Sequence, residues 1–152
     1  MDLQRQANLY RKELFEKFVE VKQGHPGSTF SMLEIVTTLY HGGYVGFEDK
    51  VIISKGHATV ALYPILRDFD IIPQEDWDNW GKGKPTCLRV FGNISIPGID
   101  MTSGSLGHGI GVGAGMAIAN PNSHVHVVIS EGELYEGSTW EALLFVAHRQ
   151  IK

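Results

Sequence analysis

The chain has 152 residues, of which 43% are hydrophobic and 20% charged, so it is long enough for one domain with its own core. Its net charge of −4 gives no basic field for nucleic acid or an anionic membrane surface, and no apolar run approaches the roughly 20 residues of a membrane span. A single cysteine, Cys87, excludes an internal disulfide and a cysteine-based zinc site, and the charged N-terminus lacks the apolar core of a signal peptide, so we expect a cytoplasmic protein.

The first third of the chain alternates apolar periodic segments with turns. Apolar residues spaced three to four apart predict an amphipathic helix over residues 3–22, which the GHPGS turn ends. Ser31, followed three residues later by Glu34, has the pattern of a capping box and predicts a helix that runs to about Tyr40. The continuous apolar run KVIIS at 50–54 is typical of a buried parallel strand.

The rest of the chain continues this alternation around an irregular stretch, 81–105, that is rich in glycine, lysine and proline. The predicted elements are a helix over 59–69, a helix that begins near Pro73, a tightly packed buried helix over 106–119, a strand over 125–129 and a helix over 138–150. Because helices alternate with short apolar strands, we predict an α/β fold with a parallel sheet flanked by helices, in a single domain over residues 1–152.

Two patterns that can signal a cofactor or a metal have simpler interpretations. Gly109, Gly111 and Ala114 have the spacing of a dinucleotide fingerprint, but they follow an irregular stretch instead of a strand. We therefore interpret them as close helix packing. His124 and His126 share one face of a strand and could pair on a metal, but no third ligand is near in sequence, so a packed or solvated role is favoured.

Other residues lie where an α/β fold places its ligand contacts. His25, in GHPG, and His57, in KGHA, lie in turns next to periodic elements. The segment SEGELYEGSTWEA at 130–142 follows an apolar strand and opens a helix. Its glycines allow phosphates to approach the backbone, and a carboxylate at the end of a strand can ligate Mg²⁺. This turn is typical of a site for a metal-bound diphosphate.

Four segments, in this order, resemble the N-terminal, diphosphate-binding part of transketolase: QGHPGSTFSMLEIVTTLY, VIISKGHATVALYPIL, PGIDMTSGSLGHGIGVGAGMAIA and SEGELYEGSTWEALLFVAHRQ. The resemblance covers nearly the whole chain, from about residue 7 onward. It implies an α/β fold of the thiamine diphosphate-binding type, truncated relative to the family domain. It also implies thiamine diphosphate and Mg²⁺ as cofactors, and transfer of a two-carbon ketol unit from a ketose to an aldose.

The resemblance assigns roles to individual residues. His25 matches the family histidine that contacts the ketol hydroxyls of the substrate, and His57 matches the one near the diphosphate and the reaction centre. Gly104 and Leu106 match turn residues that lie against the cofactor, and Gly132 matches a glycine that contacts the diphosphate. A further match, Glu136, corresponds to a glutamate that helps to link two cofactor sites across a dimer.

The chain also departs from the family pattern. Where the family has Gly-Asp-Gly, this sequence has Ser130-Glu131-Gly132, so Glu131 becomes the expected metal ligand. Its extra methylene should weaken Mg²⁺ binding unless the backbone adjusts, because Mg²⁺ demands near-ideal octahedral geometry. The second metal ligand of the family, an asparagine on the next strand, would fall beyond Lys152, so we expect an incomplete metal site. Phe91 stands about where the family usually has a substrate-binding histidine.

These features favour an N-terminal subunit of a split transketolase-like transferase that is inactive by itself. Complementary transketolase-like chains would supply the rest of the diphosphate domain and the pyrimidine-binding domain, in a hetero-oligomer acting on a sugar or sugar phosphate. A second hypothesis, motivated by Glu131 and Phe91, is a non-catalytic structural or regulatory partner that has lost the metal site. A third is that the chain is a fragment of a longer gene product. Neither nucleic acid nor a membrane is an expected partner.

Overall fold

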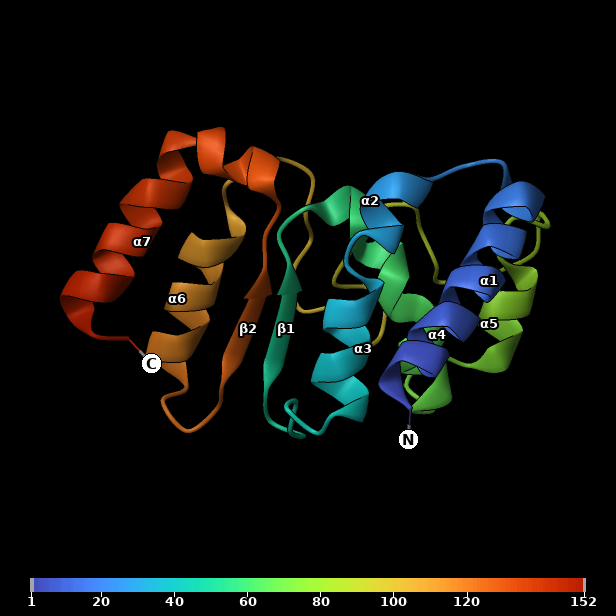
Figure 1. The fold of residues 1–152 in the computed structure, drawn as a ribbon, viewed down its shortest axis with the longest axis horizontal. Helices are drawn as coiled ribbons and strands as arrows, with labels where there is room; N and C mark the ends of the chain where they lie inside the picture. The colour runs from blue at the N-terminus through green and yellow to red at the C-terminus, as the bar shows by residue number, and fades with distance from the viewer. Residues whose placement is uncertain (1, 152) are drawn as a thin grey trace.

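Two strands that are distant in sequence pair at the centre of the molecule. In the computed structural model, which describes residues 2–151, β1 (Lys50–Ile53) and β2 (Val125–Val128) are parallel neighbours, with Lys50 opposite Val125. Helices surround this two-stranded sheet (Figure 1). The predicted α/β class with a parallel sheet is therefore confirmed.

Helices α1 (Leu3–Val21), α2 (Pro26–Phe30) and α3 (Leu33–His41) precede the sheet. The first prediction is confirmed, but the predicted capping box at Ser31 is wrong. Ser31 closes α2 in a helical backbone conformation, and its hydroxyl donates to the carbonyl of Ser28 at 2.9 Å. An N-cap residue needs a non-helical conformation, so Ser31 is not available for that role, and α3 starts after Met32 without a side-chain cap.

The predicted helix over 59–69 is divided in two. A 3₁₀ helix, η1 (Gly56–Leu62), leads into α4 (Tyr63–Asp68), which is followed by α5 (Gln74–Asn79). Pro64 occupies the first turn of α4. Proline has no N–H to donate to the carbonyl four residues earlier. It is therefore tolerated in the first turn of an α-helix, and the α-helix begins next to Pro64.

The C-terminal elements are α6 (Gly109–Ala119), the 3₁₀ helix η2 (Glu131–Tyr135) and α7 (Gly137–Arg149). Close packing of α6 is confirmed, since a Cβ on Gly113 would lie 2.6 Å from Val127. The prediction that this helix is buried is wrong for half of its surface. Gly113 and Ala114 are buried, whereas Ile118 is exposed, because β2 and α7 cover only one side of α6.

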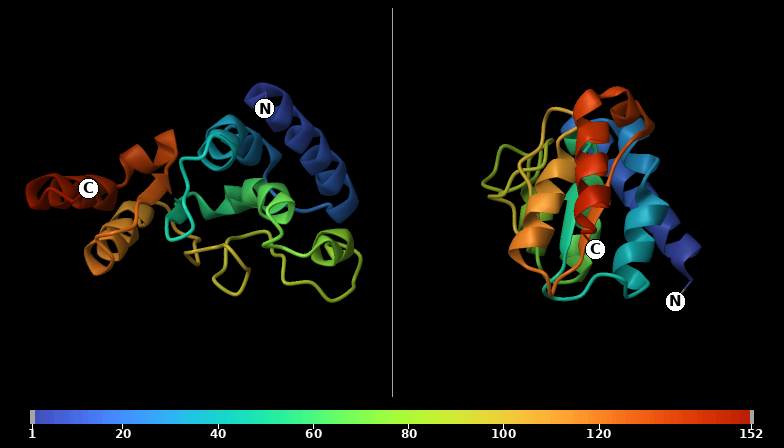
Figure 2. Two further views of the ribbon diagram at one scale, coloured as in Figure 1. Left: turned by 90° about the horizontal axis from the view of Figure 1, so that it is seen from below. Right: turned by 90° about the vertical axis from the view of Figure 1, so that its left-hand side faces the viewer.

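The hydrophobic core lies on one side of β2. Among residues 2–151, the core cluster comes from the segment between Tyr10 and Ile99, with Val128 as its contribution from β2. Figure 2 shows α6 and α7 extending from the sheet at the opposite end of the molecule from α1 and α5. No helix within the described residues is long and apolar enough to cross a membrane.

Candidate functional site

A cavity of about 520 Å³ opens beside the carboxyl ends of β1 and β2, the edge at which open parallel sheets bind their ligands. Its walls come from the segment around α2, the turn after β1, the turn before α6 and the segment after β2. The lining residues are Gly27, Ser28, Ser31, Met32, Ile35, Lys55, His57, Leu106, Val128, Ile129, Ser130 and Glu131. Three residues predicted from the sequence, His57, Leu106 and Glu131, are therefore brought together.

The two predicted histidines are in contact. The ring of His25, at the start of α2, meets the ring of His57, in the first turn of η1, edge to face at a centroid distance of 5.2 Å. The Nε2 atom of His57 lies 3.0 Å from the hydroxyl oxygen of Ser28. Burial, reinforced by His25 and Lys55, lowers the pKa of His57 below its ordinary value of 6.5. The His57 ring is therefore predominantly neutral at pH 7.

Phe91 completes an aromatic group around His25. It comes from the irregular stretch before α6, and its ring lies 5.9 Å from that of His25, again edge to face. The side chain beside the histidine is therefore apolar. It offers no hydrogen bond to a polar substrate group at that point.

Sequence reasoning missed the central role of Glu133, which is fully buried. Its Oε1 accepts hydrogen bonds from the Ser54 hydroxyl and from the backbone N–H of Gly107 at 2.9 Å, and its Oε2 accepts from the N–H of Ser130 at 3.0 Å. This carboxylate joins the end of β1 to the turns before α6 and after β2. Ser130 and Glu133 form the capping box of η2, so the same spacing rule applied at Ser130 would have found it.

The remaining predicted residues lie outside the cavity lining. Gly104 and Gly132 are exposed, and a Cβ on Gly104 would meet nothing within 4 Å, while one on Gly132 would reach only the Ser130 hydroxyl at 3.9 Å. Neither has a positive φ, so neither packing nor backbone conformation requires glycine there. Glu136 is exposed at the start of α7, next to Gly107.

The possible metal ligands are dispersed. Glu131 is exposed at the cavity, and within residues 2–151 no group of three His, Cys, Asp or Glu side chains could hold a metal ion. The rings of His124 and His126 lie 6.4 Å apart, and Nδ1 of His124 instead faces Oδ1 of Asp49 at 3.4 Å. The packed or solvated interpretation of the histidine pair stays a prediction.

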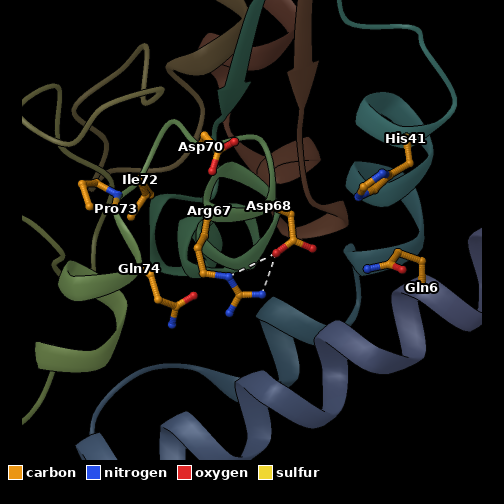
Figure 3. Close-up of a pocket in the computed structure, with 8 residues that line it drawn as sticks. All are labelled: Gln6, His41, Arg67, Asp68, Asp70, Ile72, Pro73 and Gln74. Atoms are coloured by element: carbon orange, nitrogen blue, oxygen red, sulfur yellow. Dashed lines mark hydrogen bonds and ion pairs between the residues drawn. The ribbon is translucent and has the colours of Figure 1, made fainter.

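A second cavity, of about 530 Å³, lies among α1, α3 and α4 and the start of α5 (Figure 3). Two of its charged groups are paired, since Arg67 contacts Glu13 at 2.8 Å and Asp68 at 2.7 Å. The Tyr10 hydroxyl donates to Asp68 at 2.8 Å and lies 2.6 Å from Nε2 of His41. This network fastens the helices to one another, and the predicted site residues lie elsewhere.

Comparison with known proteins identifies the family of this chain. Residues 4–152 match the family described as transketolase, thiamine diphosphate binding domain. The chain belongs to the transketolase family.

Similar proteins of this family include separate subunits. The chain is 33% identical to a 6-deoxy-6-sulfo-D-fructose transketolase subunit of a Clostridium species, over 99% of this chain and 59% of the relative. It is 35% identical to an apulose-4-phosphate transketolase subunit of Phocaeicola vulgatus, over 95% and 54% respectively. The transketolase of Mus musculus is 29% identical, over 91% of this chain and 24% of its own length. The chain thus spans little more than half the length of the two subunits.

Proposed function

We propose that this chain is the N-terminal subunit of a split transketolase-like enzyme that transfers a two-carbon ketol unit from a ketose to an aldose. The observation that carries this proposal is the cavity at the carboxyl ends of β1 and β2, where His57, Leu106 and Glu131 meet and His25 packs on His57. The site brings two imidazole side chains, His25 and His57, close to the carboxylate of Glu131 and to exposed turns. Membership of the transketolase family supports the same activity.

Thiamine diphosphate is the cofactor that we propose for this site. Gly104 and Gly132 leave open space where a side chain would otherwise project, and Leu106 supplies an apolar wall. We propose that these three residues lie against the cofactor, with Glu131 as the protein ligand of a Mg²⁺ ion on its diphosphate. When bound, thiamine diphosphate supplies the carbanion stabilisation that cleavage of a C–C bond beside a carbonyl requires.

The protein groups would position the substrate and move protons. His25, exposed at the start of α2, would hydrogen-bond the ketol hydroxyls. His57, mainly neutral and close to the Ser28 hydroxyl, can accept a proton at one ring nitrogen while the other donates. Glu136, exposed at the start of α7, would face a neighbouring protomer, where it would help to couple the two sites.

We further propose that residues 1–152 form part of one diphosphate-binding domain, which a complementary transketolase-like chain completes. An apolar cavity of about 320 Å³ lies among α6, β2 and α7, and the side chains of Trp140 and Leu144 on α7 are exposed. A partner that adds a strand beside β2 would cover these groups and supply the remaining metal ligands. The relatives that are themselves named as subunits support this arrangement.

The decisive experiment is to purify the chain from its native source, identify the co-purifying polypeptide by mass spectrometry and reconstitute the pair. With thiamine diphosphate and Mg²⁺, the complex should transfer ketol units and the isolated chain should not. In the complex, His25→Ala should lower kcat/KM by about 100-fold or more, whereas His124→Ala, at an exposed histidine remote in sequence, should have no effect. Turnover by the chain alone would contradict the requirement for a partner.

A second candidate function is that of a non-catalytic partner in a transketolase-like complex. Two observations favour it: within the described residues Glu131 belongs to no group of three possible metal ligands, and the apolar Phe91 packs on His25. Titration of the assembled complex with thiamine diphosphate and Mg²⁺ separates the two functions. Absence of binding would favour the non-catalytic role.

A further inference from the structure

Lys55 is a buried ammonium group that has no anionic partner among residues 2–151. Its side chain follows β1 and is 6% exposed, and its Nζ donates to the Ser28 carbonyl at 3.1 Å and to the Ser31 hydroxyl at 2.8 Å. Both acceptors are neutral. An ammonium group carries three donors, so one N–H is left over. None of the ion pairs formed within residues 2–151 includes Lys55.

Lys17 shows what the fold does elsewhere with a buried lysine. It is equally buried, at 6% exposed, and its Nζ pairs with the carboxylate of Glu20 at 2.8 Å. Burying a charge is costly unless the charge is paired. The absence of a carboxylate on Lys55 among the described residues therefore needs an explanation that Lys17 does not need.

The nearby carboxylates do not supply the missing partner. Burial lowers the pKa of Lys55, while Glu133 and Glu131 oppose that shift and favour the charged form. The carboxylate of Glu133, however, is occupied by Ser54, Gly107 and Ser130. Lys55 therefore presents positive charge to the cavity, which it lines together with His57 and Glu131.

We propose that Lys55 binds the anionic group of the ligand in this cavity through its remaining N–H, by contact with phosphoryl oxygens of the diphosphate. This inference rests on the proposed function, which places a diphosphate there. A lysine ammonium group binds phosphate as a point charge, and two hydrogen bonds hold that of Lys55 in place. Ser28 and Ser31 fix the direction of the ammonium group before the ligand arrives, and no metal ion is needed for this contact.

The test measures binding of inorganic pyrophosphate to the full chain by calorimetry, with EDTA present so that divalent metals are excluded. Lys55→Gln keeps a polar side chain of similar length and should weaken binding by about 10-fold to 100-fold, the loss of a charge-assisted hydrogen bond. Lys55→Arg keeps the charge and should stay closer to the wild-type affinity. Lys12→Gln, at an exposed lysine on α1, is the matched control and should bind as the wild type does.

Equal pyrophosphate affinity of the wild type and Lys55→Gln would overturn the inference, and so would the absence of pyrophosphate binding by the wild type. Either result leaves the proposed function standing if the reconstituted complex still binds thiamine diphosphate and transfers ketol units. If Lys55→Gln fails to fold, NMR of the lysine ¹³Cε groups in the wild-type chain replaces it. The Lys55 signal should shift on addition of pyrophosphate while that of Lys17 does not, and an unmoved Lys55 signal counts against the inference.

Discussion

The segment before residue 100 contains almost all of the buried core cluster, whereas the segment after it contributes only Val128 among the described residues. In the first, side chains such as Leu14, Leu62 and Ile65 are fully buried around β1. In the second, the side chains of Trp140 and Leu144 on α7 are 53% and 71% exposed. The second segment has the apolar content of a core without the layers that would bury it. This difference supports the proposal that α6, β2 and α7 take part in an interface with a complementary chain.

The largest expected effect is on the free energy of unfolding, and it is seen by comparing a buried leucine, Leu14, with an exposed one, Leu144. Leu14→Ala, in the core face of α1, should lower the free energy of unfolding of the chain by about 2–5 kcal/mol, because it leaves a cavity. Leu144→Ala, on the exposed face of α7, should change it by less than about 0.5 kcal/mol. Urea unfolding of both variants measures this. Similar losses at the two sites would show that α7 is packed in the isolated chain.

The next effect concerns Glu133, which joins the two segments. Glu133→Gln should lower the free energy of unfolding by about 1–3 kcal/mol, because an amide places its NH₂ group against donors that now bond a carboxylate. Glu141→Gln, on the exposed surface of α7, is the control and should be neutral. If both variants unfold at the same urea concentration, the carboxylate does not hold the segments together.

Hydrogen exchange measures the local stability of the two segments without a substitution. Backbone amides of α7 should exchange well before those of α1, because local opening of α7 exposes little additional apolar surface. Mass spectrometry of peptic peptides from the isolated chain measures this order. Binding of the complementary chain should slow exchange in α7 and leave α1 unchanged, and protection confined to α1 would argue against an interface on α7.

The smallest effect is the pH dependence from His57, which lies where the segments meet. Because its folded-state pKa is lowered, its contribution to stability is present above about pH 6.5 and is lost as pH falls through the folded pKa. His57→Gln should therefore flatten the decline in unfolding free energy below pH 6.5. His124→Gln, at the exposed histidine beside Asp49, is the control. An unchanged decline in the His57 variant would show that this histidine is not desolvated.

Local patterns predicted the regular elements well, and they failed where neighbouring elements compete for a residue. The spacing of Ser31 and Glu34 fits a capping box, yet α2 ends on Ser31 and takes it into its own last turn. The same spacing at Ser130 and Glu133 does form a capping box, because Ser130 leaves β2 in an extended conformation. Sequence spacing alone cannot distinguish these two cases.

Within the site, residues next to a recognisable turn could be predicted, and residues that act across the fold could not. His57 and Glu131 lie in turns at strand ends, and both line the cavity. Lys55 acquires its significance only from a neighbour that is remote in the chain, Ser31. Such contacts depend on how β1 and α2 are placed in space, which no local pattern encodes.

Patterns within short stretches of the sequence predicted the α/β class and the parallel strands, because these depend on periodicity and turn chemistry. The transketolase-like diphosphate site was predicted from the resemblance of four segments to transketolase. Tertiary structure alone decided which charges are paired. It buries Glu133 among donors from three segments, and within the described part of the chain it leaves the Lys55 ammonium group at the cavity without an anionic partner. The physical reason is that burial and pairing of a charge are properties of the surrounding packing, and residues far apart in the chain supply that packing.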